Sequence, residues 1–509
     1  MNTIVVDSKI SVEHGLLPPA VWEQVKSALT FENYEKKVAL REKLWNAKDM
    51  PDHIRLYEEH RRIGLLPRGF ALQLKRGLKA YNLEFEWDDR RVRVPIDTSA
   101  WTPIVFGPER QYQEDAVTRI LDVQQGMWQA PPGAGKTVGI LEAIRRSGQR
   151  ALIVVNKSNI AKQWVERSEQ FLGFTPGIVG DGEFEVKDIT VALQQTLWSR
   201  SGDFDTSGWW DQFGFVCLDE CHHLSARTYT ETVSSFPAMI RVGVSGTPDQ
   251  QEHTMPMMEA TLGHVFVKTS RAELVKAGII SSPKVVARKT EFDYEYFPTH
   301  DNVPGVDCEV EGCTGSPRSR VHRNNYTKMV EVLAKDTDRN DLIAADVANA
   351  LVEGRTVMVI SKRLAHLEDL KQRAAALLSS DARLITFTGA QKSDERMEIA
   401  ERAANGNVAL FSTIADEALD IPRLDTIVLA WPTANPKITE QQVGRVVRTH
   451  SAKLAPVVYD YVDVNVTVLR KQFYKRAKQY YRVEGFEIEG MSDGARRSPW
   501  ATEQLVFHT

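Results

Sequence analysis

The chain has 509 residues, of which 42% are hydrophobic and 26% charged, as in an ordinary globular protein of about three domains. Four cysteines make no disulfide framework, and no run approaches the roughly 18 apolar residues of a membrane span, so we expect a soluble, cytoplasmic protein in a reducing compartment. The formal net charge of −4 gives no global signal for nucleic-acid binding, so any such surface has to be local.

Residues 1–100 carry no catalytic motif, and we expect them to form an N-terminal α+β accessory domain. The spacing of apolar residues predicts four helices, at Pro19–Leu29, Glu32–Trp45, Ile54–Arg62 and Phe70–Tyr81. An alternating run at Arg91–Val94 then predicts a strand.

Residues 101–288 alternate between short apolar runs and helical patterns, which predicts a parallel α/β lobe. Its buried strands are expected at Ala151–Val155, Phe215–Leu218 and Arg241–Val244. A segment at 289–328 rich in proline and glycine interrupts the pattern and is interpreted as a linker or excursion. There, the spacing of Cys308 and Cys313 is a poor zinc signature, and a basic cluster (Arg318, Arg320, His322 and Arg323) suits either DNA phosphates or a solvated loop.

The run Ala130–Thr137, which we call the phosphate-binding loop, has the glycines, lysine and hydroxyl residue that grip a nucleoside triphosphate. Backbone N–H groups and a helix N-terminus face phosphate oxygens in such a loop. Lys136 would reach the outer phosphates, and the Thr137 hydroxyl would hold Mg²⁺. The strict pattern has glycine at position 130, where this chain has alanine.

Two adjacent carboxylates, Asp219 and Glu220, follow the predicted strand Phe215–Leu218. The carboxyl end of such a strand is where an α/β sheet places its ligand chemistry. We expect Asp219 to hold Mg²⁺ and Glu220 to orient and deprotonate the attacking water. Ser245 and Thr247, after the next strand, suit a relay of nucleotide state or a simple turn, and zinc binding by the adjacent Cys221, His222 and His223 is not expected.

Residues 329–468 repeat the α/β pattern and predict a second lobe, with strands at Thr356–Ile360, Leu384–Phe387, Val408–Phe411, Thr426–Ala430 and Val457–Tyr461. Gln441–Arg448 is expected to begin a helix that carries Gln441, Arg445 and Arg448 on one face. Guanidinium groups there would reach the γ-phosphate only on closure of the lobes, as arginine fingers do. In residues 469–509, cations alternate with aromatics, which suits either nucleic-acid contact or a helix packed on its domain.

Taken in order, these motifs resemble those of superfamily-two helicases, which implies two tandem RecA-like lobes and an Mg·ATP site. In that family, the alanine at position 130 is tolerated. The resemblance implies that Arg110, Gln113, Pro132, Gly133, Ala134, Gly135, Lys136, Thr137 and Asp420 bind ATP, with Gln113 at the base edge. It implies that Asn156, Lys157, Gln195, Thr196, Ser361, Lys362, Arg363, Thr388, Gly389 and Thr413 contact DNA. Ala418 departs from the family's usual glycine and puts the role of Asp420 in question.

Within the superfamily, the Asp219–His223 box and the segment Arg110–Gln113 look most similar to the XPB-like group, which includes phage UvsW-type helicases. The segment Leu66–Phe70 resembles part of the DNA-recognition domains that such proteins carry. The resemblance implies a DNA-stimulated ATPase and helicase in DNA repair or recombination. It would work on duplex or branched DNA, near the nucleoid, with a nuclease or recombination protein as a candidate partner.

Three other functions remain open from the sequence. An RNA helicase shares all the ATPase motifs. A restriction-type translocating subunit would act for a separate nuclease, because no nuclease motif is evident. A nucleotide-gated DNA-binding switch would bind and release DNA without moving along it.

Overall fold

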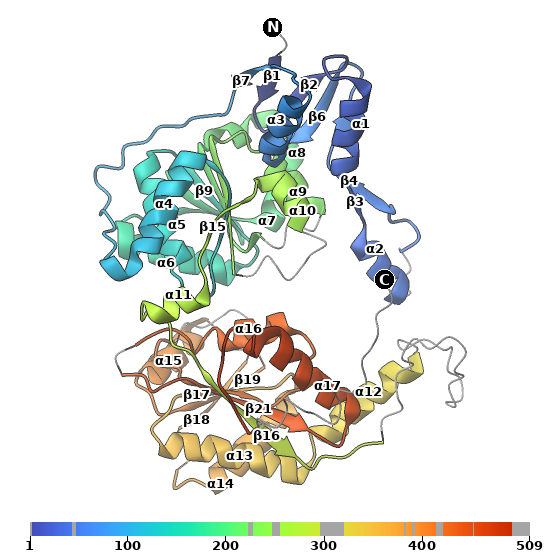
Figure 1. Ribbon diagram of the computed structural model, residues 1–509. Helices are drawn as coiled ribbons and strands as arrows, with labels where there is room; N and C mark the ends of the chain where they lie inside the picture. Colours follow the sequence, from blue (N-terminus) through green and yellow to red (C-terminus); the bar gives the residue numbers. More distant parts are fainter. Residues whose placement is uncertain are drawn as a thin grey trace, which may run out of the picture. The chain divides into compact units, whose positions relative to one another are not determined.

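The computed structural model describes residues 3–42, 47–221, 227–246, 255–295, 320–380, 383–388, 391, 393–413, 421–450 and 452–490. The chain divides into two compact units, Met1–Ala277 and Gly278–Thr509. The first holds an N-terminal domain and an α/β lobe, and the second holds another α/β lobe (Figure 1). None of the described helices is both long and apolar enough to cross a membrane.

The N-terminal domain is a five-stranded sheet of order β5-β6-β2-β1-β7 with helices packed on it. Its core includes Ile4, Ile10, Leu66 and Leu74, and β2 alternates buried and exposed positions as a half-buried strand does. The strands are β1 Thr3–Val6, β2 Lys9–Glu13, β5 Glu58–Glu59, β6 Ile63–Pro67 and β7 Glu86–Asp89, with a separate pair β3 Thr30–Glu32 and β4 His53–Arg55. The helices are α1 Pro19–Ala28, α2 Tyr34–Glu42 and α3 Ala71–Ala80.

Two of the predictions for this domain are wrong. Ile54–Arg62 is not a helix but contains β4 and β5, because its apolar residues Ile54 and Leu56 are spaced by two, and Ile54 pairs with Phe31. Arg91–Val94 is not a strand; Val92 makes a single bridge to Ala238, and Pro95 makes another to Gln149. This segment connects the N-terminal sheet to the lobe and pairs only where it passes the lobe's edge.

The first lobe is an eight-stranded sheet of order β11-β10-β12-β9-β13-β14-β8-β15, parallel throughout except for β10 with β11. Every residue of β9 and β13 is buried, which is why these strands are continuous apolar runs. The strands are β8 Gln125–Gln129, β9 Ala151–Val155, β10 Gly177–Gly180, β11 Glu183–Phe184, β12 Ile189–Leu193, β13 Phe215–Leu218, β14 Ile240–Ser245 and β15 Val265–Lys268. The helices are α4 Gln111–Val123, α5 Lys136–Ser147, α6 Ser158–Leu172, α7 Gln194–Ser199, α8 Ser201–Ser207, α9 Arg227–Ser234, α10 Met255–Leu262 and α11 Arg271–Lys276.

The second lobe is a seven-stranded parallel sheet of order β18-β19-β17-β20-β21-β16-β22. The two parallel α/β sheets confirm the predicted fold class. The strands are β16 Lys284–Thr290, β17 Val357–Ile360, β18 Leu384–Phe387, β19 Ala409–Ser412, β20 Thr426–Leu429, β21 Val457–Asp463 and β22 Ile488–Glu489. The helices are α12 Arg320–Leu333, α13 Thr337–Val352, α14 Leu364–Ala376, α15 Ser393–Ala404, α16 Pro436–Val443 and α17 Thr467–Arg476.

The second lobe extends further at both ends than the sequence indicated. The chain enters its sheet at Lys284, before the expected boundary at residue 288, and β16 pairs with β21 over seven residues. After α17, β22 pairs with β16 on its other side. Residues 469–490 are therefore part of this lobe.

The basic aromatic run packs on its own domain in the described part. Phe473, Tyr480 and Tyr481 are buried. The guanidinium of Arg476 binds both carboxylate oxygens of Asp460, at 3.0 and 2.7 Å, and the Tyr481 hydroxyl donates to the same carboxylate at 2.7 Å. Of the two interpretations of this segment, these side chains follow the packed helix, because a buried cation needs its partner inside the fold.

Candidate functional site

The phosphate-binding loop joins the carboxyl end of β8 to the first turn of α5. Gly133 and Gly135 have φ of +85° and +74°, and a Cβ on Gly135 would collide with the side-chain amide of Gln113. The backbone conformation therefore favours glycine at position 135, and a larger residue would also displace the Gln113 amide from the loop. The loop delivers the N-terminus of a 12-residue helix, where backbone N–H groups are available to anionic ligands.

Lys136 and Ala130 close the loop on itself. The Lys136 ammonium donates a hydrogen bond to the Ala130 carbonyl at 2.7 Å, and the Ala130 N–H donates to the Ser245 carbonyl at 3.1 Å. Ala130 is fully buried, so the residue that departs from the strict pattern fills a core position. Ser245 thus touches the loop through its backbone, because β14 lies beside β8.

The first turn of α4 holds the loop from the other side. The Tyr112 hydroxyl donates to the Ala134 carbonyl at 2.7 Å, and the Gln113 amide donates to the Gly135 carbonyl at 2.9 Å. The Gln113 oxygen accepts a long hydrogen bond of 3.4 Å from Arg110. Gln113, expected at the base edge, is fully buried and binds the loop backbone here. The role of Tyr112 was missed, because no sequence pattern specifies a hydroxyl that meets a loop carbonyl.

Asp219 and Glu220 follow β13, which lies between β9 and β14. The Asp219 carboxylate accepts hydrogen bonds from the indole N–H of Trp164 at 2.8 Å and from the Glu220 N–H at 2.9 Å. Burial raises the pKa of Asp219 to about 6, the Glu220 charge adds to this shift, and the Lys136 ammonium opposes it. Lys136 and Asp219 are therefore brought together. Glu220 has φ of +47°, a conformation rare for a residue other than glycine.

Oxygen donors of the kind that Mg²⁺ prefers follow strands at this edge of the sheet, namely the Thr137 hydroxyl at the start of α5 and the Asp219 carboxylate after β13. The residues present therefore fit this ion. In contrast, Cys217 and Cys221 lie in the hydrophobic core, where burial raises the pKa of both thiols.

The expected DNA contacts of the first lobe lie at the carboxyl ends of neighbouring strands. Asn156 and Lys157 follow β9 and lead into α6, while Gln195 and Thr196 lie at the start of α7, after β12. Leu193 pairs with Val155 in the sheet, so the two segments emerge side by side. Asp219 and the phosphate-binding loop emerge at the same edge.

In the second lobe, the expected contacts Ser361–Arg363, Thr388 and Thr413 follow β17, β18 and β19, which are neighbours. Ser361 is buried, and its hydroxyl contacts His366 at 2.9 Å. This hydroxyl is thus used inside the lobe in this structure, and the DNA contact expected at Ser361 stays a prediction. Arg363 pairs with Glu331 at 3.0 Å.

The expected single helical face for Gln441, Arg445 and Arg448 is wrong. Helix α16 ends at Val443, Arg445 lies in a turn, and Arg448 makes an antiparallel bridge to Ile280. Gly444 and the β-branched pair Val446 and Val447, which is buried, favour this exit from the helix. Thr247, Gly389, Ala418, Asp420, His222, His223, Cys308 and Cys313 lie outside the described residues.

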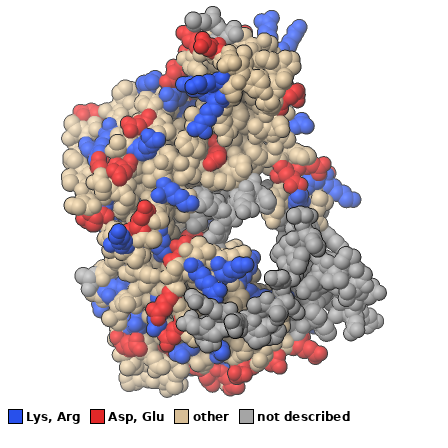
Figure 2. All heavy atoms as spheres, viewed as in Figure 1, with Lys and Arg blue, Asp and Glu red and all other residues tan. Residues whose placement is uncertain are grey.

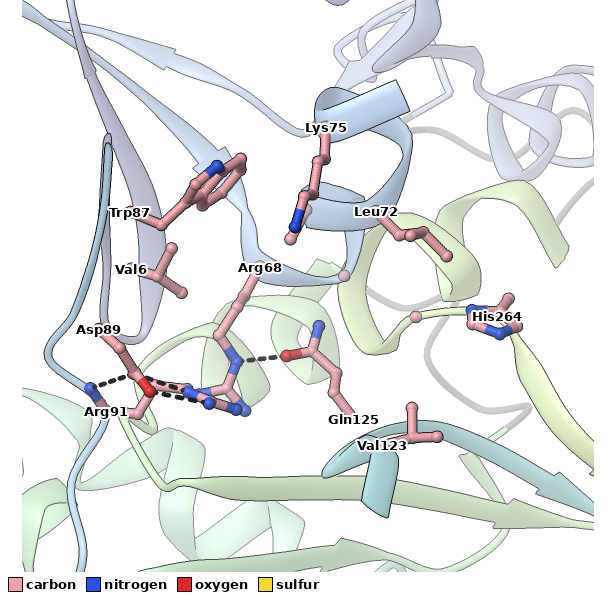
Figure 3. Close-up of a pocket in the computed structure, with 13 residues that line it drawn as sticks. Val6, Arg68, Leu72, Lys75, Trp87, Asp89, Arg91, Val123, Gln125 and His264 are labelled. Carbon is pink, nitrogen blue, oxygen red and sulfur yellow. Dashed lines mark hydrogen bonds and ion pairs between the residues drawn. The ribbon is translucent and has the colours of Figure 1, made fainter. Parts of the chain in front are cut away.

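A seam joins the N-terminal domain to the first lobe around Arg68, which is 1% exposed (Figure 3). Its guanidinium donates to the Gln125 side chain at 2.6 Å and to the Ala238 carbonyl at 2.7 Å, both in the lobe, and to Asp7 of the β1–β2 turn at 3.2 Å. Arg241, from the lobe, reaches Ser8 of the same turn. Buried carbonyl oxygens thus accept hydrogen bonds from both guanidinium groups.

The segment Leu66–Phe70, which resembles part of a DNA-recognition domain, forms this seam. A Cβ on Gly69 would lie 2.5 Å from backbone atoms at the end of α10, so no larger residue fits without separating the domains. Beside it is a cavity of about 380 Å³, where Trp87 and Lys75 of the N-terminal domain face Val123 and Gln125 of the lobe (Figure 3). The described residues of this segment therefore dock the domain.

In Figure 2, basic and acidic side chains are interspersed over the described parts of the face in view, in keeping with the net charge of −4. On these parts of that face, any attraction for a polyanion would depend on particular groups and not on a patch of one charge.

Two family models match the chain. Residues 107–250 match "Type III restriction enzyme, res subunit", and residues 342–450 match "Helicase conserved C-terminal domain". These ranges contain the phosphate-binding loop and the second-lobe motifs, respectively.

Among curated proteins, the chain is similar to "DNA 3'-5' translocase XPB2" of Sulfurisphaera tokodaii, with 25% identity over 67% of this chain and 78% of that protein. It is also similar to "Probable helicase D10" of Escherichia phage T5, with 25% identity over 82% of this chain and 83% of that protein. Among solved structures, "ATP-dependent Type ISP restriction-modification enzyme LlaBIII bound to DNA" shares the fold, with a TM-score of 0.54 and 13% identity. That match covers 75% of this chain and 30% of the other.

The raised pKa of Asp219 leads to a prediction. The folded chain should bind a proton at this carboxyl up to about pH 6, whereas the unfolded chain releases it near 3.8. This group therefore lowers the free energy of unfolding as pH rises from about 4 to about 6. The indole N–H resonance of Trp164, assigned with Trp164→Phe, should titrate with a midpoint near pH 6. A midpoint below 4.5 would contradict the raised pKa.

The seam leads to a second prediction. Arg68→Ala removes charged hydrogen bonds and leaves buried acceptors unpaired, so the free energy of unfolding should fall on the order of 3 kcal/mol. Urea denaturation measures this, and limited proteolysis should show faster cleavage between the domain and the lobe. Arg76→Ala, on the exposed face of α3, is the control. Equal behaviour of the two variants would show that Arg68 does not hold the domain.

Proposed function

The chain belongs to the superfamily-two helicases, in the group that includes XPB and UvsW, and we propose that it couples ATP hydrolysis to movement along DNA. The observation that carries the proposal is the meeting of Lys136, Asp219 and the expected DNA-contacting segments at one edge of the first sheet. ATP hydrolysis and DNA binding would then both take place at the carboxyl ends of the strands in this sheet. Duplex or branched DNA is the substrate that we propose.

In this proposal, the phosphate-binding loop holds the β- and γ-phosphates. Lys136 exchanges its hydrogen bond to the Ala130 carbonyl for phosphate oxygens, which are better partners for an ammonium. Thr137 and Asp219 would hold Mg²⁺, which supplies charge neutralisation on the phosphates. Glu220 orients the attacking water and accepts its proton.

Gln113 and Tyr112 act on the same loop from its other side. Their hydrogen bonds to the Ala134 and Gly135 carbonyls fix the loop's backbone, so the N–H groups of these residues keep their direction toward a phosphate. Contact of Gln113 with a nucleobase would require its amide to leave the Gly135 carbonyl. Base recognition would then be coupled to the shape of the loop.

In this proposal, the second lobe supplies arginines that add positive charge to the nucleotide site. Arg445 lies in the turn after α16 and Arg448 in the bridge beyond it, so they project from different backbone environments. We propose that Arg445 neutralises the negative charge on the γ-phosphate in the transition state, when the lobes close on ATP. Such an arginine contributes about 10³ to 10⁵ in rate in other phosphoryl-transfer enzymes. Repeated closure and opening would advance one DNA strand held across both lobes. A nuclease or a recombination protein is the partner class that we propose.

Lys136→Ala tests the hydrolytic centre. We expect it to abolish ATP hydrolysis and strand displacement, because no other group described in the loop can take the place of the ammonium. Wild-type ATPase activity should rise with forked or branched DNA more than with matched RNA. A wild-type protein whose ATPase ignores DNA would contradict the proposal, and one that prefers RNA would assign it to RNA. DNA-stimulated hydrolysis without strand or triplex displacement would indicate a switch.

Arg445→Ala tests the contribution of the second lobe. We expect ATP binding to stay within a few-fold of wild type while turnover falls by about 10³ or more, because the arginine acts in the transition state. Fluorescent-nucleotide binding and single-turnover hydrolysis separate the two effects. Arg383→Ala is the control, since Arg383 precedes β18, the first strand in the sheet order, and binds Asn407. Equal turnover in both variants would show that Arg445 has no particular role in ATP hydrolysis.

A further inference from the structure

Trp164 makes a contact with the candidate site that no sequence motif indicated. It lies in the second turn of α6, is 2% exposed, and donates its indole N–H to Asp219 Oδ2 at 2.8 Å. The apolar part of the ring lies in the interior of the lobe. Its one polar atom thus meets the carboxylate that we assign to Mg²⁺.

This hydrogen bond restricts the direction of the carboxylate. Oδ1 accepts the Glu220 N–H and Oδ2 accepts the indole N–H, so the two oxygens are held from different elements. A carboxylate otherwise turns freely about its last side-chain bond. Because a metal-binding carboxylate depends on its hydrogen-bond partners for orientation, loss of one partner typically costs 10- to 100-fold in metal affinity or activity.

Helix α6 connects this contact to the expected DNA-binding segment. Lys157 is the N-cap of the helix, and Trp164 follows seven residues later. Seven residues make about two turns, so Lys157 and Trp164 lie on the same side of the helix, roughly 10 Å apart. A displacement of the start of α6 therefore also moves the indole against Asp219, because a single helix behaves as a rigid element on this scale.

We propose that Trp164 is a positioning residue that orients Asp219 for Mg²⁺ and transmits DNA binding at the start of α6 to that carboxylate. The second half of this inference rests on the proposed function. The first half depends only on the nucleotide site. In this scheme, DNA held by Asn156 and Lys157 sets the position of α6, and the indole N–H sets the direction of the carboxylate.

A plain core tryptophan would give a different result. It would contribute to stability only through the volume of its ring, and phenylalanine would fill much of that volume. Trp210 offers a matched control in the same lobe, since it is 5% exposed and donates its indole N–H to Asp205 at 2.6 Å. Trp164→Phe and Trp210→Phe thus each remove one hydrogen bond from a buried indole to a carboxylate, and only the first concerns Asp219.

The first experiment measures metal binding without turnover. Mn²⁺ is titrated into the full chain with bound ADP, and the bound ion is followed by electron paramagnetic resonance. We expect Trp164→Phe to weaken Mn²⁺ binding about 10- to 100-fold and Trp210→Phe to leave it within twofold of wild type. Wild-type affinity in Trp164→Phe, or an equal loss in both variants, would overturn the positioning role.

The second experiment measures the ratio of ATPase rates with and without forked DNA at saturating Mg²⁺. We expect Trp164→Phe to lose most of this stimulation and Trp210→Phe to retain it. Full stimulation in Trp164→Phe would overturn the transmission role. If the wild type shows no stimulation, the proposed function fails and transmission fails with it, while the Mn²⁺ titration still decides the positioning role. If Trp164→Phe does not fold, 3-benzothienylalanine at position 164 replaces the N–H by sulfur at nearly the same volume, and the same outcomes apply.

Discussion

Parallel pairing of strands is the constraint on which the rest of this structure depends. When β8, β9, β12, β13 and β14 run in the same direction, their carboxyl ends come to one edge of the sheet. Residues separated by more than eighty positions, such as Lys136 and Asp219, then act on each other electrostatically. The second lobe follows the same rule, since the residues that come after β17, β18 and β19 emerge at one edge of its sheet. A site of this kind needs no dedicated scaffold beyond the sheet itself.

The sequence predicted most of the elements that build these sheets. Ala151–Val155, Phe215–Leu218 and Leu384–Phe387 are strands with the expected bounds. The first two were predictable because strands buried on both faces are unbroken apolar runs. The phosphate-binding loop was predictable for a different reason. Gly133 and Gly135 have positive φ, and a Cβ on Gly135 would also collide with the Gln113 amide, so the backbone conformation of the loop requires glycine at these positions of the motif.

Other features depend on contacts that a local pattern does not contain. The hydrogen bonds of Trp164 to Asp219 and of Arg68 to Gln125 each join residues more than fifty positions apart. Helical spacing placed Arg445 and Arg448 on one face, but α16 stops after Val443, where the following chain pairs with Ile280. Ser361 matched a motif by position, yet its hydroxyl is used against His366. In each case tertiary contacts overrode a local signal.

Strand β8 has a mechanical consequence. Its first residue, Gln125, holds Arg68 of the N-terminal domain, and the residue after its last, Ala130, begins the loop that grips phosphate. A pull on that domain is therefore carried lengthwise along five residues, all of which pair with β14 and the last three of which also pair with β15. Backbone hydrogen bonds loaded in this direction share the force and resist it together, whereas sideways peeling would break them one at a time. Force applied to the N-terminal domain would thus reach the phosphate-binding loop with little displacement of the strand.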